Sequence, residues 1–205
     1  MKSLRIVVAA AGLALICAPS FAQNSHGGGS ADLGDGPASQ QFVDAVQKSD
    51  GDKATDLIAS HPTIINSRDD NGNTGLIIAI LRSDPSWTGF LLNKGADPNA
   101  PGAAGDTPLI ATARVGFEQG AEWLLSLGAK VDGDNKMGET PLIVAVQQRD
   151  RQLVKLLLDH GADPDKTDTA AGYSARDYAT RDPRAREILM LINQKKPKGS
   201  ATAAR

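Results

Sequence analysis

The sequence predicts an all-α fold, a solenoid of about five helix-turn-helix units of roughly 33 residues with short β-turns at the tips. Three recurring features indicate it. A Gly-x-Thr or Gly-x-Ser turn begins at Gly72, Gly105, Gly138 and Gly172. A Gly-Ala turn begins at Gly95, Gly128 and Gly161. A leucine pair, which we expect in the core, precedes these turns at Leu91-Leu92, Leu124-Leu125 and Leu157-Leu158. Successive members are 33 residues apart, except for a last step of 34 to Gly172.

Residues 1–22 show the three-part pattern of a cleavable secretory signal peptide. Two basic residues precede an apolar stretch over 6–18, and Ser20 and Ala22 supply small residues before the expected cut. The apolar run is too short to cross a hydrocarbon layer of about 30 Å as a helix. We therefore expect cleavage after Ala22 and a periplasmic or secreted protein. An uncleaved segment would instead give an envelope-anchored structural protein.

The rest of the chain divides by composition and repeat spacing. Residues 23–37 contain five glycines and no apolar periodicity, which predicts a flexible leader. A polar, disordered tail is expected over 194–205. The units between them are a capping unit (about 38–68), three repeats (about 69–101, 102–134 and 135–167) and a C-terminal unit (about 168–193).

The unit at 102–134 shows why each unit should be a turn followed by two helices. Gly105 permits a positive φ in the turn, and Thr107 can cap the first helix. Pro108 then occupies the first helical position, where a missing N–H costs nothing. A second helix is expected over 117–127 and should end at Gly128. One such unit cannot bury its own apolar face, so neighbouring units must stack.

The GxTPLIxxA core, the paired leucines and the GADxN turn at this period resemble the ankyrin repeat family, over about residues 38–193. One departure matters. The histidine that family members usually carry after Thr-Pro-Leu is replaced by Ile77, Ile110 and Ile143. The resemblance implies polar links between turns through that histidine, so we expect apolar packing in their place.

The resemblance also implies a non-enzymatic module that holds a partner protein on a concave face, built from the turn tips and the first helices. Residues there that differ between units, while the packing positions repeat, are the candidate contacts. The candidate partner-binding residues are Arg82, Asp106, Arg114, Lys136, Met137, Glu139, Gln147 and Tyr173. As surface positions they should contribute little to the stacking of the units.

Composition argues against other functions. The chain has 22 basic and 24 acidic residues and a formal charge of -2, which disfavours binding to nucleic acid by phosphate neutralisation. One cysteine and three scattered histidines offer no metal-ligand or catalytic spacing. The acidic turns at 69–73 and 132–136 lack the ligand pattern of a calcium loop. We therefore expect no catalytic residues, no metal and no cofactor.

The leading hypothesis is a monomeric, exported bacterial protein that binds a protein partner and has no membrane contact after cleavage. An accessory or immunity-type role in the periplasm, in oxidative-stress defence or toxin neutralisation, is the alternative. The envelope-anchored structural protein is a third possibility, and an enzyme would need a cleft of converging groups that the repeats do not supply.

Overall fold

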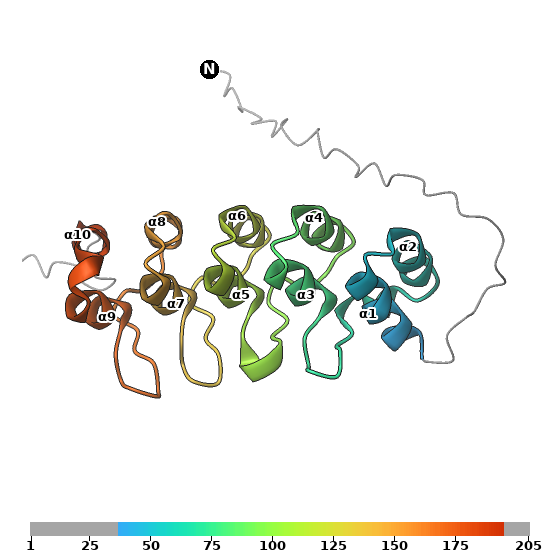
Figure 1. Ribbon diagram of the computed structural model, residues 1–205, viewed down its shortest axis with the longest axis horizontal. Helices are drawn as coiled ribbons and strands as arrows, with labels where there is room; N and C mark the ends of the chain where they lie inside the picture. Colours follow the sequence, from blue (N-terminus) through green and yellow to red (C-terminus); the bar gives the residue numbers. More distant parts are fainter. Residues whose placement is uncertain (1–36, 195–205) are drawn as a thin grey trace, which may run out of the picture. The chain divides into compact units, whose positions relative to one another are not determined.

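The computed structural model describes residues 37–194, which form ten α-helices and three short 3-10 helices (Figure 1). The first helices of the pairs are α1 (Ala38–Lys48), α3 (Gly75–Leu81), α5 (Pro108–Val115), α7 (Pro141–Gln148) and α9 (Ala175–Arg181). The second helices are α2 (Gly51–Ser60), α4 (Pro85–Asn93), α6 (Glu118–Ser126), α8 (Arg151–Asp159) and α10 (Arg186–Gln194). The 3-10 helices are η1 (Pro62–Asn66), η2 (Ala103–Gly105) and η3 (Pro183–Ala185).

The predicted all-α repeat fold is confirmed. Within residues 37–194 no named strand occurs, and the only strand-like pairing is two isolated bridges, between Arg68 and Thr74 and between Thr167 and Ser174. The predicted signal peptide, leader and tail lie outside the described residues, apart from Pro37 and Gln194.

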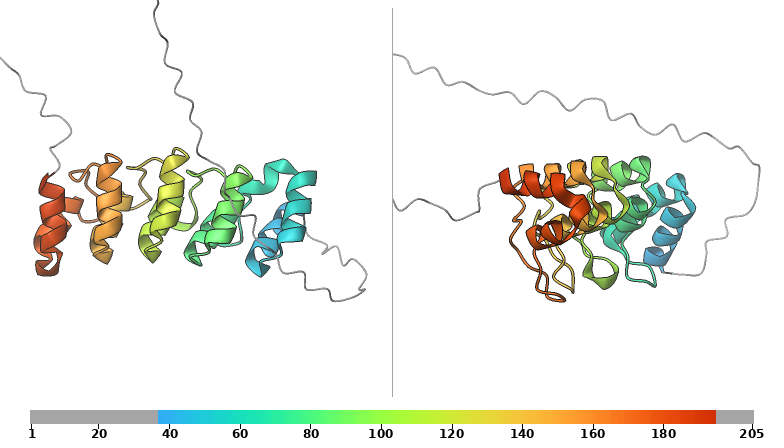
Figure 2. Two further views of the ribbon diagram at one scale, coloured as in Figure 1. Left: turned by 90° about the horizontal axis from the view of Figure 1, so that it is seen from above. Right: turned by 60° about the vertical axis from the view of Figure 1, so that its left-hand side comes forward.

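The helix pairs stand side by side in one row (Figure 2). Each first helix packs against the next, from α1 through α3, α5 and α7 to α9. The second helices form a parallel row, in which α4, α6, α8 and α10 contact their neighbours. The connecting turns extend together to one side of the helices, below them in Figure 1. This arrangement brings the turn tips of successive units next to one another.

The predicted helix starts are confirmed. The hydroxyls of Thr74, Thr107 and Thr140 accept hydrogen bonds from the backbone N–H groups three residues later, at 3.2–3.3 Å. Pro108 and Pro141 occupy the first turn of their helices. In the last unit Ser174 forms a capping box with Asp177, so the first helices of all four units from α3 onward begin at a side-chain cap.

The turn glycines are needed for their conformation and for space. Gly105 and Gly138 have φ values of 82° and 73°, as the sequence predicts. A Cβ atom on Gly138 would lie 2.7 Å from the backbone nitrogen of Thr169 in the next turn. Only glycine therefore permits both the left-handed conformation and the close approach of neighbouring turns.

Aliphatic side chains from both rows of helices form the core. Ile77, Ile110 and Ile143, which replace the family's usual histidine, are buried as predicted. Among the leucine pairs Leu125 is the exception, because it is only half-buried at the edge of the core. Adjacent residues on a helix point about 100° apart, so the two members of a leucine pair cannot face the core equally.

We expect Leu157→Ala to lower the free energy of unfolding by about 2–5 kcal/mol, because the side chain is fully buried between stacked units. Leu127→Ala is the matched control. This leucine is 54% exposed, and its loss should change stability by no more than about 0.5 kcal/mol. Denaturant unfolding followed by circular dichroism measures both. Equal losses in the two variants would contradict the assignment of the core.

Candidate partner-binding surface

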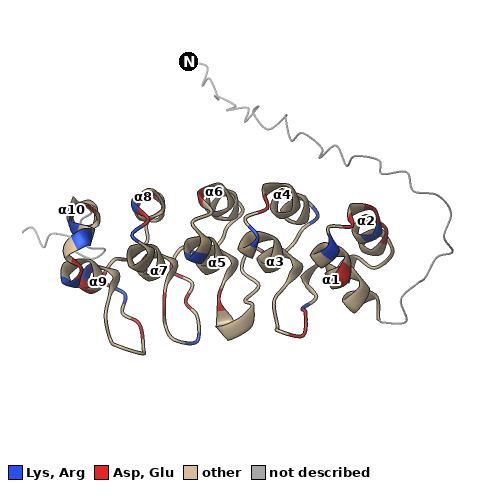
Figure 3. Ribbon diagram, viewed as in Figure 1, with Lys and Arg blue, Asp and Glu red and all other residues tan. Residues whose placement is uncertain are grey.

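The turn tips and the C-terminal ends of the first helices form one surface, which we call the tip face. It comprises the eight candidate residues with two exposed neighbours, Leu81 and Val115. Both basic and acidic residues occur in every unit along the ribbon (Figure 3). Recognition by a general electrostatic field is therefore not favoured, and the individual side chains decide what this face can bind.

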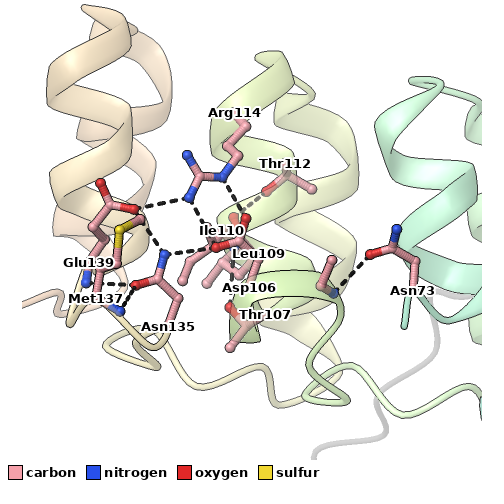
Figure 4. A network of polar contacts seen from close by, with 11 residues as sticks. Asn73, Asp106, Thr107, Leu109, Ile110, Thr112, Arg114, Asn135, Met137 and Glu139 are labelled. Carbon is pink, nitrogen blue, oxygen red and sulfur yellow. Dashed lines mark hydrogen bonds and ion pairs between the residues drawn. The ribbon is translucent and has the colours of Figure 1, made fainter. Parts of the chain in front are cut away.

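Three of the candidate residues meet in one ion-pair network between the second and third repeats (Figure 4). The guanidinium of Arg114 donates from Nε to Asp106 Oδ2 at 2.6 Å and from Nη2 to Asp106 Oδ1 at 3.0 Å. Nη2 also donates to Glu139 Oε2 at 3.0 Å. The side chains of Arg114, Asp106 and Glu139 are 33%, 17% and 13% exposed. Arg114 thus links the turn of its own repeat, at Asp106, to the turn of the third repeat, at Glu139.

Asn135 completes this network and is not among the eight residues predicted from the sequence. Its side-chain Nδ2 donates to Asp106 Oδ1 at 2.8 Å and to Glu139 Oε2 at 2.9 Å. Its Oδ1 accepts from the backbone N–H groups of Met137 and Glu139 at 2.9 and 3.0 Å. The buried amide therefore shapes the turn and joins the two carboxylates. We call Asp106, Arg114, Asn135 and Glu139 the central network.

A repeat signal could have identified Asn135. Asp69 and Asp168 occupy the same place in their units, and each caps its turn. Asp69 Oδ1 accepts from the backbone N–H groups of Asn71 and Asn73, and Asp168 Oδ1 accepts from those of Ala171 and Gly172. A polar residue that recurs at the start of a turn is therefore a capping position.

The second repeat has Gly102 at this place, and its turn is held differently. A Cβ atom on Gly102 would lie 2.6 Å from Ile77 Cδ1 and 2.7 Å from Asn73 Oδ1. That Asn73 oxygen accepts from the backbone N–H of Ala103 at 3.0 Å (Figure 4). The Asn73 side chain, which comes from the preceding unit, thus takes the place of the missing cap.

The charge of the central network is not balanced. The hydrogen bond that Arg114 donates to Asp106 raises the pKa of Arg114, although burial opposes the shift. The guanidinium therefore stays charged, but two carboxylates face it, and the group carries one net negative charge when both are ionised. This arrangement disfavours a further carboxylate at the site.

The last unit links turn and helix at the equivalent positions. Tyr173 follows Gly172 as Asp106 follows Gly105, and Arg181 stands in the register of Arg114. The Arg181 guanidinium carbon lies 3.6 Å from the centroid of the Tyr173 ring. A cation–π contact therefore replaces the ion pair.

Gln147, another candidate residue, lies beside Tyr178. The Tyr178 hydroxyl donates to Asp168 Oδ2 at 2.6 Å. This hydrogen bond, with burial and the carboxylate charge, raises the pKa of Tyr178 to about 12, while a hydrogen bond with Gln147 opposes the shift. Ionising the phenol would place two negative oxygens together, so Tyr178 serves as a neutral donor.

The remaining candidate residues present exposed side chains. Arg82 is exposed and donates from Nη1 to the backbone oxygen of Val46 at 3.1 Å. Lys136 and Met137 occupy the third-repeat tip, and both are exposed. Their backbones are tied to neighbouring tips: the Lys136 N–H donates to Ala104, and the Met137 carbonyl oxygen accepts from the N–H of Thr169. Hydrogen bonds to the neighbouring tips therefore fix the backbone that carries the Lys136 and Met137 side chains.

Between residues 37 and 194 no group of three His, Cys, Asp or Glu side chains could hold a metal ion. Over the same residues, no helix has both the length and the apolar character that crossing a membrane requires.

Capped helix pairs that stack through their first helices and align their turns define a helical repeat solenoid. The family model for ankyrin repeats, in three copies, matches residues 76–168. Residues 76–168 therefore consist of ankyrin repeats, which are generally protein–protein interaction modules and typically non-enzymatic. No curated protein matches the chain.

The ion pairs change the expected effect of replacing Arg114, which the sequence alone treats as a surface residue. We expect Arg114→Ala to lower the free energy of unfolding by about 1–3 kcal/mol, because two partly buried carboxylates lose their donor. Arg151→Ala is the control, since its ion pair with Glu187 is exposed and should contribute less than about 1 kcal/mol. Urea unfolding at neutral pH compares them. A smaller loss for Arg114→Ala than for Arg151→Ala would show that the central network does not stabilise the stack.

Proposed function

We propose that this protein is an exported, non-enzymatic module that binds a partner protein through the tip face. One observation carries the proposal. Three of the five exposed large hydrophobic side chains in residues 37–194 belong to this face, namely Leu81 (45%), Val115 (36%) and Met137 (44%). Exposed apolar side chains surrounded by polar groups are typical of protein interaction sites.

The rigidity of the face supports the same proposal. Backbone hydrogen bonds join the third-repeat tip to the tips on both sides, and the central network joins α5 to the third turn. A surface held in one conformation loses little entropy on binding. The ordinary packing requirements are already met by the repeated residues, so the side chains at the tips are free to specify a partner.

A crosslinking capture from the native periplasm tests the use of this face. The variant Leu81→Ala/Lys136→Glu/Met137→Ala should retain about a tenth or less of the captured partner, because it removes two apolar contacts and reverses one charge. Its melting temperature should stay close to that of the wild type, since none of these side chains is buried. Arg82, Gln147 and Tyr173 at the sides of the face can be replaced in turn.

The matched control is Leu127→Ala/Lys130→Glu, which makes similar changes at exposed residues of the loop that follows α6. The control should capture the partner as well as the wild type does. If the control loses capture and the tip-face variant retains it, the binding site lies outside the tip face and the proposal is wrong.

Export is the second part of the proposal, and it rests on the pattern of residues 1–22. Mass spectrometry of the exported protein should find Gln23 as the first residue. Ala22→Tyr should block this cleavage, because the processing site requires a small residue there. An intact Met1 in the exported wild-type protein would contradict the signal peptide.

A further inference from the structure

Two polar atoms of the central network have no hydrogen-bond partner among the described residues. They are Nη1 of Arg114 and Oε1 of Glu139. The other polar atoms of these two groups are used, because Nε and Nη2 of Arg114 donate to carboxylates and Oε2 of Glu139 accepts two hydrogen bonds. Figure 4 accordingly draws no dashed line to either atom.

Both atoms are accessible from outside. Within residues 37–194 the one buried side-chain nitrogen or oxygen without a partner is Oγ1 of Thr88. The open atoms of Arg114 and Glu139 are therefore not buried. In Figure 4 they point to the same side of the network, away from the turn that Asn135 caps. One open donor and one open acceptor thus belong to two side chains that the 3.0 Å hydrogen bond from Arg114 Nη2 to Glu139 Oε2 joins.

The geometry and the charge together restrict what can bind there. A carboxylate would meet the net negative charge of the network. An ammonium or guanidinium group has donors only, so it could not accept from the open Nη1 of Arg114. A primary carboxamide is neutral, and it carries an acceptor oxygen and a donor N–H₂ in one plane. It can accept from Arg114 Nη1 and donate to Glu139 Oε1 at once.

The surroundings suit a side chain that brings this group on an apolar stem. Met137 lies against the network in Figure 4 and is exposed. The methylene groups of an incoming side chain can pack on this residue. Arg114 is held by three hydrogen bonds, so little ordering is needed when a ligand binds.

We infer that the central network receives the side-chain carboxamide of a glutamine or asparagine of the partner protein, which donates to Glu139 Oε1 and accepts from Arg114 Nη1. This inference rests on the proposed function, because it names the chemistry by which the tip face selects its partner. A main-chain peptide group has the same donor and acceptor, and the experiment below separates it from a side chain.

Glu139→Gln is the decisive variant. Since Oε2 of Glu139 accepts from Arg114 and Asn135, a glutamine would turn its carbonyl oxygen toward these donors. Its N–H₂ would then replace the open acceptor, and the site would offer two donors. Such a site favours a carboxylate over a carboxamide. The variant should therefore prefer a carboxylate to a carboxamide, while the shape of the site stays the same.

The test uses a displayed library of short random peptides, selected on the wild-type protein. Selected peptides should share a glutamine or asparagine, and replacing that residue by glutamate, lysine or alanine should weaken binding by about tenfold or more. Glu139→Gln should weaken the glutamine peptide by about tenfold or more and should bind its glutamate version better than the wild type does. Glu122→Gln, the same substitution at an exposed residue of α6, should leave both affinities unchanged. Circular dichroism establishes that both variants are folded.

Several results would overturn the inference. Peptides that share an acidic or basic residue at this place, or that bind Glu139→Gln as well as the wild type, would exclude a carboxamide site. If alanine replaces the glutamine without loss, the main chain is the ligand and the inference is wrong. Peptides sensitive to Met137→Ala but not to Glu139→Gln would retain the proposed function and reject the inference. Peptides insensitive to both, or no selected peptide, would count against both.

Discussion

The contact between the first helices of neighbouring units is the interaction on which the rest of this structure depends. Each helix pair is too small to bury its apolar face, and the buried face of α5 is shared between α3 and α7. Each unit of such a stack contacts mainly its neighbours, so every interface between units must be stable enough to continue the array. The threonine caps, the turn glycines and the buried aliphatic residues recur at the same period because they serve this one contact.

The absence of a histidine link between turns shows how the stack can be maintained by other means. Ile77, Ile110 and Ile143 add apolar burial beneath the turns. Polar contacts between turns occur instead at their tips, where Asn73 bonds to the second repeat and Arg114 bonds to the third. These tip contacts differ from one unit to the next, whereas the packing beneath them is uniform. The packing inside the array is therefore regular, whereas the contacts at its surface differ from unit to unit.

This division underlies our proposal that the central network both stabilises the stack and offers a site for a partner. Arg114 uses Nε and Nη2 to brace two units and leaves Nη1 open, while Glu139 uses one carboxylate oxygen and leaves the other open. A group held on one side and open on the other costs little to organise when a ligand arrives. The exposed Met137 beside it supplies an apolar surface. In this proposal stability and recognition share the same residues, so we expect a substitution at Arg114 to affect both.

The sequence by itself determined the period, the helix pairs and the turns. These features rest on local chemistry: a threonine hydroxyl reaches an N–H three residues on, proline suits the first helical turn, and glycine permits a positive φ at Gly105 and Gly138. Each depends on neighbours a few residues away, and each recurs at 33 residues, so coincidence is excluded. The eight candidate residues could be placed on one surface for the same reason.

Only the tertiary structure decided which of those residues are engaged and which are open. The sequence does not show that Arg114 pairs with Asp106 and Glu139, or that Asn135 joins them, because these contacts depend on how two units are placed relative to each other. It also could not distinguish the half-buried Leu125 from the buried Leu124, since both occupy apolar helical positions. A repeat period specifies what each unit contains. The orientation of side chains across an interface follows from the packing of the whole stack.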